Sequence, residues 1–310
     1  MSKTAFVFPG QASQYSGMGL ETAREFPVAA AVFAEADEVL GFPLSELCFQ
    51  GAEEQLTLTE HTQPAILTVS VAVLRVLEQA GRRPDYVAGH SLGEYSALVA
   101  AGAISFADAV AVVRLRGRYM QEAVPVGVGA MAAVLGADLV AVEEICDVAR
   151  GEQVLQPANI NCPGQVVIAG HREAVERAIE RAKEKGFRRT VLLPVSAPFH
   201  CELMVPAREK LADRLVDIAF HDLWQPLVNN VDAAFISSGV AARDSLIRQV
   251  TAAVRWQQSM EKLLAEGVDT FVEIGPKTVL SGMIKKISRD VRIMAVEKPA
   301  EIRQAMAEWE

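Results

Sequence analysis

Tyr86-Val87-Ala88-Gly89-His90-Ser91-Leu92-Gly93-Glu94 is the segment that constrains the architecture of this 310-residue chain most strongly. It begins with apolar residues typical of a buried strand, and the residues from Leu92 to Ala101 favour a helix that Gly102 ends. Between them stands Gly-x-Ser-x-Gly, whose glycines leave room for a tight turn that lifts the serine off the sheet edge. The segment predicts a nucleophile elbow with Ser91 as nucleophile, and a serine that merely caps a helix is the alternative.

Neighbouring segments place this turn in an α/β sheet. Residues Thr4 to Phe8 form a continuous apolar and β-branched run, typical of a strand buried on both faces, which ends at Pro9-Gly10-Gln11. Loops that follow the strands of a parallel sheet meet at one edge, so we expect Gln11 near Ser91, although a plain surface turn also fits. Further strands, expected at 226–231, 270–274 and 292–296, alternate with helices and extend the sheet.

Residues 126–196 follow a different order of elements. We expect a strand, a helix, two strands, a helix and a strand, at 131–135, 138–150, 154–161, 165–169, 172–185 and 190–195. This βαββαβ order predicts a ferredoxin-like small domain, inserted into an α/β-hydrolase-like catalytic domain of residues 1–125 and 197–310. Asn159 and Asn161 alternate along one strand and share a face, where they either line a cleft or make turns.

Besides the helix that follows Ser91, three helices are expected before this insertion. One covers 21–40, another begins with Pro64 in its first turn and runs to Leu77, and the third follows a capping box that starts at Ser105. The third helix carries Arg116 beside its apolar stripe. An unpaired buried guanidinium is costly, so Arg116 either pairs with an anionic side chain of this chain, extends its charged end to solvent, or binds the anionic group of a ligand.

Among the five histidines, His200 is the candidate base for Ser91. It lies in a Pro-rich loop far beyond the serine, in the order nucleophile then base of α/β hydrolases. We expect His90 to point away from the serine, and we place the remaining histidines at a helix entrance, at a helix start and beside Trp224: His61, His171 and His221. Cys201, next to His200, is expected to pack rather than react.

Composition excludes several classes of protein. A net charge of −9 argues against a nucleic-acid binder, and the four cysteines show neither zinc spacing nor a disulfide pattern, so no metal is expected. The N-terminus does not read as a signal peptide and no apolar run is long enough to span a membrane, so we expect a soluble, cytoplasmic protein. Lys285 and Lys286 form either a docking patch for an acidic protein or a solvated helix face.

Read together, these motifs resemble the malonyl-CoA:acyl-carrier-protein transacylases of fatty-acid synthesis and the acyltransferase domains of polyketide synthases. The resemblance runs nearly end to end. It rests on Phe8-Pro9-Gly10-Gln11, Gly17-Met18-Gly19, Thr62-Gln63-Pro64-Ala65, Gly89-His90-Ser91-Leu92-Gly93-Glu94, Arg114-Leu115-Arg116-Gly117, Asn161 with Pro163-Gly164-Gln165, Pro198-Phe199-His200, Gln249 and Glu273-Ile274-Gly275-Pro276.

The resemblance implies a role for each matching residue. Ser91 would be the nucleophile and His200 its general base, oriented by the main-chain carbonyl of Gln249 because the family has no acid partner at this point. The amides of Gln11 and Leu92 would form the oxyanion hole.

On the substrate side, the resemblance implies that Arg116 grips the free carboxylate of malonate in a bidentate manner. Asn159 and Asn161 match positions that line the cleft. Phe199 matches a position associated with the choice of malonyl over methylmalonyl.

The implied reaction is ping-pong transfer of malonyl from malonyl-CoA, through Ser91, to the phosphopantetheine thiol of an acidic acyl carrier protein. Coenzyme A is the product, no cofactor stays bound, and the family habit is monomeric. The sequence leaves three alternatives: a trans-acting polyketide acyltransferase, a hydrolase that edits acyl thioesters on the same dyad, and a non-catalytic docking module for carrier proteins.

Overall fold

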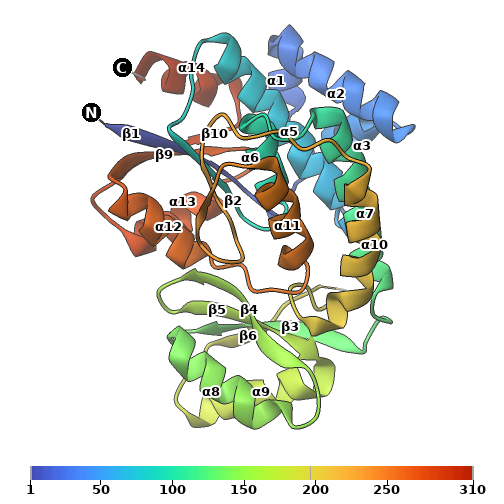
Figure 1. Ribbon diagram of the computed structural model, residues 1–310, viewed down its shortest axis with the longest axis vertical. Coiled ribbons are helices and arrows are strands. Elements are labelled where there is room, and N and C mark those ends of the chain that lie inside the picture. The colour runs from blue at the N-terminus through green and yellow to red at the C-terminus, as the bar shows by residue number, and fades with distance from the viewer. Residues whose placement is uncertain (1, 196, 309–310) are drawn as a thin grey trace.

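The computed structural model describes residues 2–195 and 197–308, which form two sheets with helices around them (Figure 1). The larger sheet has six strands in the order β10-β9-β1-β2-β7-β8, and all neighbours are parallel except β7 and β8. The expected α/β fold with a parallel sheet is therefore confirmed. The strands are β1 (Lys3–Phe8), β2 (Tyr86–Gly89), β7 (Leu227–Val228), β8 (Phe235–Ile236), β9 (Val268–Ile274) and β10 (Arg292–Val296).

Strand β1 lies inside this sheet and is buried on both faces, as its continuous apolar run predicts. Phe6 and Phe8 join one apolar core, whereas Ala5 and Val7 join a second core on the opposite face. The helices around the sheet are α1 (Leu20–Glu25), α2 (Pro27–Leu40), α3 (Leu44–Gln50), α4 (Glu53–Leu56), α5 (Thr59–Gln79), α6 (Gly93–Ala100), α7 (Phe106–Glu122), α10 (Val205–Val216), α11 (Gly239–Gln249), α12 (Trp256–Ala265), α13 (Val279–Ile287) and α14 (Pro299–Glu308).

Two expected helix boundaries are wrong. The segment 21–40 is broken between α1 and α2, because Phe26 is extended before Pro27 (φ −114°, ψ 111°) and a residue that precedes proline disfavours the helical region. Pro64 lies inside α5 rather than in its first turn. The helix begins upstream because the amides of His61 and Thr62 both donate to the Leu58 carbonyl oxygen.

The smaller sheet is antiparallel and has the order β4-β5-β3-β6. Its strands are β3 (Gly129–Leu135), β4 (Leu155–Cys162), β5 (Gln165–His171) and β6 (Thr190–Leu192). Two helices, α8 (Leu139–Arg150) and α9 (Arg172–Glu184), cover the face that points away from the larger sheet (Figure 1). The expected end of this insertion, at Ser196, lies outside the described residues.

Alternation along β3 explains how the smaller sheet joins the rest of the molecule. Ala132 and Val134 belong to a separate core with α8 and α9, whereas Met131 and Ala133 belong to the core of the larger sheet. Successive side chains on a strand point to opposite faces, so one strand serves both cores. Within the described chain, no helix combines the length and the apolar character needed to cross a membrane.

Candidate active site

Ser91 stands on a sharp turn between β2 and α6, with a backbone φ of 52°. This left-handed conformation is uncommon outside glycine and is typical of an elbow that presents its side chain. The turn is tightly packed, since a Cβ atom on Gly89 would lie 1.9 Å from the Gly93 carbonyl carbon. A Cβ on Gly93 would in turn lie 2.0 Å from the Phe8 carbonyl oxygen, so both glycines are required by contact.

His200 meets Ser91 from the loop that follows the smaller sheet. The Ser91 Oγ lies 2.7 Å from the His200 Nε2, and the His200 Nδ1 lies 2.9 Å from the main-chain oxygen of Gln249. Because a carbonyl oxygen can only accept, Nδ1 carries the proton and Nε2 is left to accept from the serine hydroxyl. Burial, together with the nearby charge of Arg116, lowers the pKa of His200 to about 3. The imidazole is therefore neutral near pH 7 and can take a proton.

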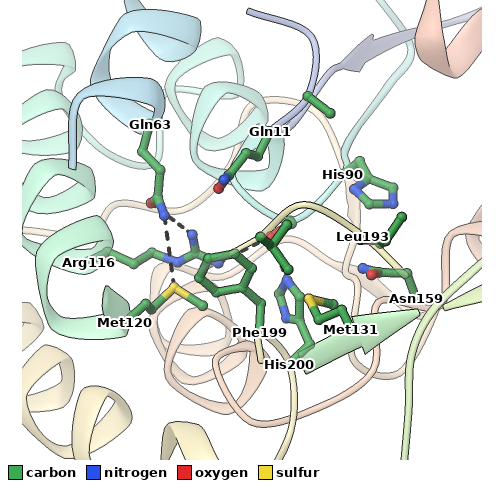
Figure 2. Close-up of a pocket in the computed structure, with 13 residues that line it drawn as sticks. Gln11, Gln63, His90, Arg116, Met120, Met131, Asn159, Leu193, Phe199 and His200 are labelled. Carbon is green, nitrogen blue, oxygen red and sulfur yellow. Dashed lines mark hydrogen bonds between the residues drawn. The ribbon is translucent and has the colours of Figure 1, made fainter. Parts of the chain in front are cut away.

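The amides of Gln11 and Leu92 flank this serine. Gln11 lines the same cavity as Ser91 and is labelled in Figure 2, and Leu92 is the next residue along the chain after Ser91. Neither amide donates a hydrogen bond within the part of the chain that the structure describes. Gly10 brings the two segments together, because a Cβ there would lie 2.4 Å from the His90 carbonyl oxygen. Amides without partners are free to donate to a developing oxyanion, which is the role predicted for these two.

Arg116 is only 2% exposed, and its hydrogen bonds all go to neutral acceptors. Nη1 donates to the Gln63 Oε1 at 2.8 Å, and Nη2 donates to the Gln249 Oε1 at 2.9 Å and to the Ser91 Oγ at 3.2 Å. The expectation of an anionic partner in direct contact is thus not met by any carboxylate of the described residues. The guanidinium is cationic and lies beside the serine, where it can receive an anion.

These groups surround a cavity of about 150 Å³ (Figure 2). A cavity of about this volume holds a benzene-sized molecule, so the space suits a short acyl group. One wall is apolar and consists of Met120, Met131, Leu193, Val195 and Phe199, whereas the polar lining comes from Gln11, Gln63, His90, Ser91, Arg116, Asn159 and His200.

The two predicted asparagines reach different places. Asn159 lines the cavity directly, whereas Asn161 binds the neighbouring His90, whose Nε2 lies 2.9 Å from the Asn161 Oδ1. The His90 side chain therefore contacts β4 of the smaller sheet and does not hydrogen-bond to Ser91.

Several other candidates lie apart from the dyad. His61 contacts the Gln55 carbonyl oxygen, and His171 accepts from the Val154 amide at the start of α9. Cys201 is buried, and its Sγ donates to the Pro198 carbonyl oxygen. Lys286 reaches Gln165, a residue of the smaller sheet, at 3.4 Å.

Sequence reasoning missed Gln63, Glu94 and Asn230. All three are buried, and Asn230 accepts from the Ser91 amide at 2.7 Å while it donates to the Gly89 carbonyl oxygen at 2.7 Å. Glu94 is fully buried in α6, and burial raises its pKa to about 7. A signal for Glu94 was present, because a carboxylate in a helix of otherwise apolar or small residues must have buried partners.

Comparison with known proteins gives one consistent result. The model of the acyl transferase domain family matches residues 5–302. The malonyl CoA-acyl carrier protein transacylase of Bacillus subtilis (strain 168) is 51% identical over 307 residues, which cover 99% of this chain and 97% of the relative. The protein of the same name from Escherichia coli (strain K12) is 49% identical and covers 99% of both chains.

Solved structures agree with these relatives. An acyl carrier protein S-malonyltransferase from Vibrio cholerae superposes with a TM-score of 0.96 at 46% identity, over 98% of this chain and 100% of that one. A malonyl-transacylase in complex with its type II polyketide synthase acyl carrier protein gives a TM-score of 0.96 at 47% identity, over 99% of both chains.

Proposed function

The chain belongs to the acyl transferase domain family, and we propose that it transfers a malonyl group from malonyl-CoA to the phosphopantetheine thiol of acyl carrier protein through a malonyl-serine intermediate. It is an acyltransferase, and coenzyme A is the first product. The ping-pong order and the role of each residue are the parts of this proposal that need experiment.

In the first half-reaction, the Ser91 Oγ attacks the thioester carbonyl of malonyl-CoA while the His200 Nε2 takes the hydroxyl proton. The carbonyl oxygen becomes an oxyanion that accepts from the amides of Gln11 and Leu92. When the carbonyl forms again, the C–S bond breaks and His200 returns the proton to the leaving coenzyme A thiolate. In the second half-reaction the phosphopantetheine thiol attacks malonyl-Ser91 by the same steps, and the serine leaves with the proton.

The position of Arg116 is the observation that favours malonyl as the transferred acyl group. Its guanidinium lies beside the nucleophile, and its acceptors are the neutral Gln63, Gln249 and Ser91. A malonyl carboxylate would give this buried cation a charged partner and could bind it in a bidentate manner. A hydrolase that edits uncharged acyl thioesters has no use for a buried cation beside the serine. Phe199 lines the same small cavity.

We also propose the finer architecture that the sequence predicts. The antiparallel order β4-β5-β3-β6, with α8 and α9 on one face, supports a ferredoxin-like subdomain at 126–196. The serine turn between β2 and α6 supports an α/β-hydrolase-like core at 1–125 and 197–310. A monomeric state and a cytoplasmic location are proposals that rest on the family resemblance.

The test is intact-protein mass spectrometry after brief incubation with malonyl-CoA. We expect the mass to rise by one malonyl group in the wild type, no gain in Ser91→Ala, and a preference shifted from malonyl toward acetyl in Arg116→Ala. Addition of holo acyl carrier protein should then remove the group and transfer it to the carrier.

Other outcomes would point to the alternatives. Coenzyme A that accumulates without an adduct indicates rapid hydrolysis and favours the editing hydrolase. If neither an adduct nor coenzyme A appears, the non-catalytic docking module is favoured. If Arg116→Ala keeps the full malonyl preference, the assigned substrate is wrong.

A further inference from the structure

Glu94 is a buried carboxylate that connects the elbow helix to α11. Its Oε1 accepts from the Ser245 Oγ at 2.9 Å, and its Oε2 accepts from the Gln249 Nε2 at 2.7 Å and from the Asn230 amide at 3.1 Å. Ser245 and Gln249 are four residues apart and therefore lie on the same face of α11. One carboxylate thus holds the last turn of α11 against the helix that begins at the nucleophile.

The Gln249 side chain lies between the buried Arg116 guanidinium and the buried Glu94 carboxyl group, whose oxygens accept from three donors. Its Nε2 donates to Glu94 at 2.7 Å and to the Ser91 main-chain oxygen at 3.0 Å, while its Oε1 accepts from Arg116 at 2.9 Å. Flipping this amide would set its NH₂ against the guanidinium and its oxygen against the carboxylate. Both contacts would be repulsive, so Glu94 and Arg116 together fix one orientation of the amide.

The main chain of the same residue orients the base, because the Gln249 carbonyl oxygen lies 2.9 Å from the His200 Nδ1. A hydrogen bond that fixes the Gln249 side chain also fixes the end of α11 from which this carbonyl projects. Glu94 itself touches neither the imidazole nor the cavity. Its influence on Ser91, His200 and Arg116 passes through Gln249.

We propose that Glu94 is a positioning residue that acts through Gln249, holding the side-chain oxygen toward Arg116 and the main-chain oxygen toward His200. No carboxylate contacts His200 directly among the described residues, and Glu94 acts on it through Gln249 instead. The part of this proposal that concerns the ratio of malonyl to acetyl adducts rests on the function proposed above. Its effect on the nucleophile can be measured without any acyl donor.

The experiment compares the wild type, Glu94→Met, Gln249→Ala and the double variant by two readouts. The first is the rate at which a fluorophosphonate labels Ser91, and the second is the ratio of malonyl to acetyl adducts on Ser91. We expect Glu94→Met to lower both by roughly tenfold, and the double variant to be no worse than Gln249→Ala alone. Glu94→Gln should retain more labelling than Glu94→Met, because its amide oxygen still accepts from Gln249 and Asn230.

Glu273→Gln is the matched control. Glu273 is also fully buried, but it accepts from the Leu280 and Ser281 amides at the start of α13 and has no contact with the dyad. We expect it to change the thermal midpoint without changing the acyl ratio. If Glu94→Met does not fold, Ser245→Ala tests the same link, because it removes the other bond from Glu94 to α11, and it should lower labelling in the same direction.

Two results would overturn the proposal: losses that add in the double variant, or a folded Glu94 variant with unchanged labelling and unchanged acyl ratio. Failure of the proposed function looks different. In that case malonyl-CoA leaves no adduct on the wild type, while the fluorophosphonate still labels Ser91 and the comparison of Glu94 with Gln249 can still be read.

Discussion

His200 is held neutral by its surroundings, and this links its protonation to folding. Its pKa is about 3 in the folded chain, below the ordinary value of 6.5. Between these values the unfolded chain binds the proton more strongly, so stability from His200 is present above pH 6.5 and is lost as the pH falls toward 3. We expect the unfolding midpoint of the wild type to drop further between pH 7.5 and pH 5 than that of His200→Gln.

Thermal unfolding at both pH values measures this difference directly. Equal drops in the two proteins would show that His200 does not titrate in the expected window. Far-ultraviolet circular dichroism at each pH confirms that both proteins start folded.

At this scale the sequence could predict that Ser91 stands on a tight turn, because that signal is local, and that His200 lies beside it, because elimination left few candidates. It could not predict the side-chain role of Gln249, since Arg116, Ser91 and Glu94, which its side chain contacts, all lie more than a hundred positions away. Arg116 is buried, so the alternative in which its charged end reaches solvent is wrong. The neutral partners that it finds depend on α5 and α11 meeting around it, which no local pattern encodes.

A substitution at Gly93, the first residue of α6, tests whether close packing against β1 maintains the turn at Ser91. Alanine favours a helix over glycine by about 1 kcal/mol, yet a Cβ here would lie 2.0 Å from the backbone oxygen of Phe8. Overpacking against backbone costs about 1–3 kcal/mol or more, so the clash prevails. We expect Gly93→Ala to lower the free energy of unfolding and to slow labelling of Ser91, as measured by urea denaturation and a fluorophosphonate.

Gly282 in α13 provides the matched control, because nothing lies within 4 Å of the position of its Cβ. Gly282→Ala should stabilise the protein by up to about 1 kcal/mol and leave labelling unchanged. A Gly93→Ala protein as stable and as reactive as the wild type would mean that the turn can relax away from β1.

For the elements, sequence patterns predicted which segments are helices and strands better than where they begin and end. The apolar run of β1 and the capping Ser105 of α7 are both found as expected, and the Ser105 Oγ accepts from the Asp108 amide. The start of α5 was missed because it depends on the Leu58 carbonyl accepting two amides, a bond pattern that Pro64 does not reveal.

The smaller sheet contributes Met131 and Asn159 to the cavity, while loops and helices supply its other lining residues, so the size of the cavity can be changed from β3. Met131 on β3 is 3% exposed and lines the cavity. We expect Met131→Ala to cost about 2–5 kcal/mol of stability and to enlarge the space beside Ser91. The variant should accept methylmalonyl-CoA better relative to malonyl-CoA, as measured by the competing adducts in intact-protein mass spectrometry.

Val134→Ala is the control on the same strand, because Val134 faces α8 and α9 in the separate core. It should destabilise the protein to a similar extent while the ratio of adducts stays at the wild-type value. An unchanged ratio in Met131→Ala would mean that the neighbouring Phe199 and Leu193 close the space again.

At the scale of the molecule, the sequence predicted the parallel sheet from its apolar strands and the insertion from its changed order of elements. The sequence could not predict how the insertion packs on the larger sheet. The face of β3 that contains Met131 belongs to one core with Phe6 and Phe8 of β1, and local sequence patterns do not encode this association of distant segments.

Because the two faces of β3 pack in different cores, one face can change in evolution while the other is kept. One face of the strand maintains the fold of the inserted sheet, while the other shapes the space around the acyl group. Mutations on the second face can reshape this space while the nucleophile, its base and the helices behind the insertion keep their residues. Lineages can thus diverge in the acyl unit they carry while they inherit one unaltered chemical apparatus.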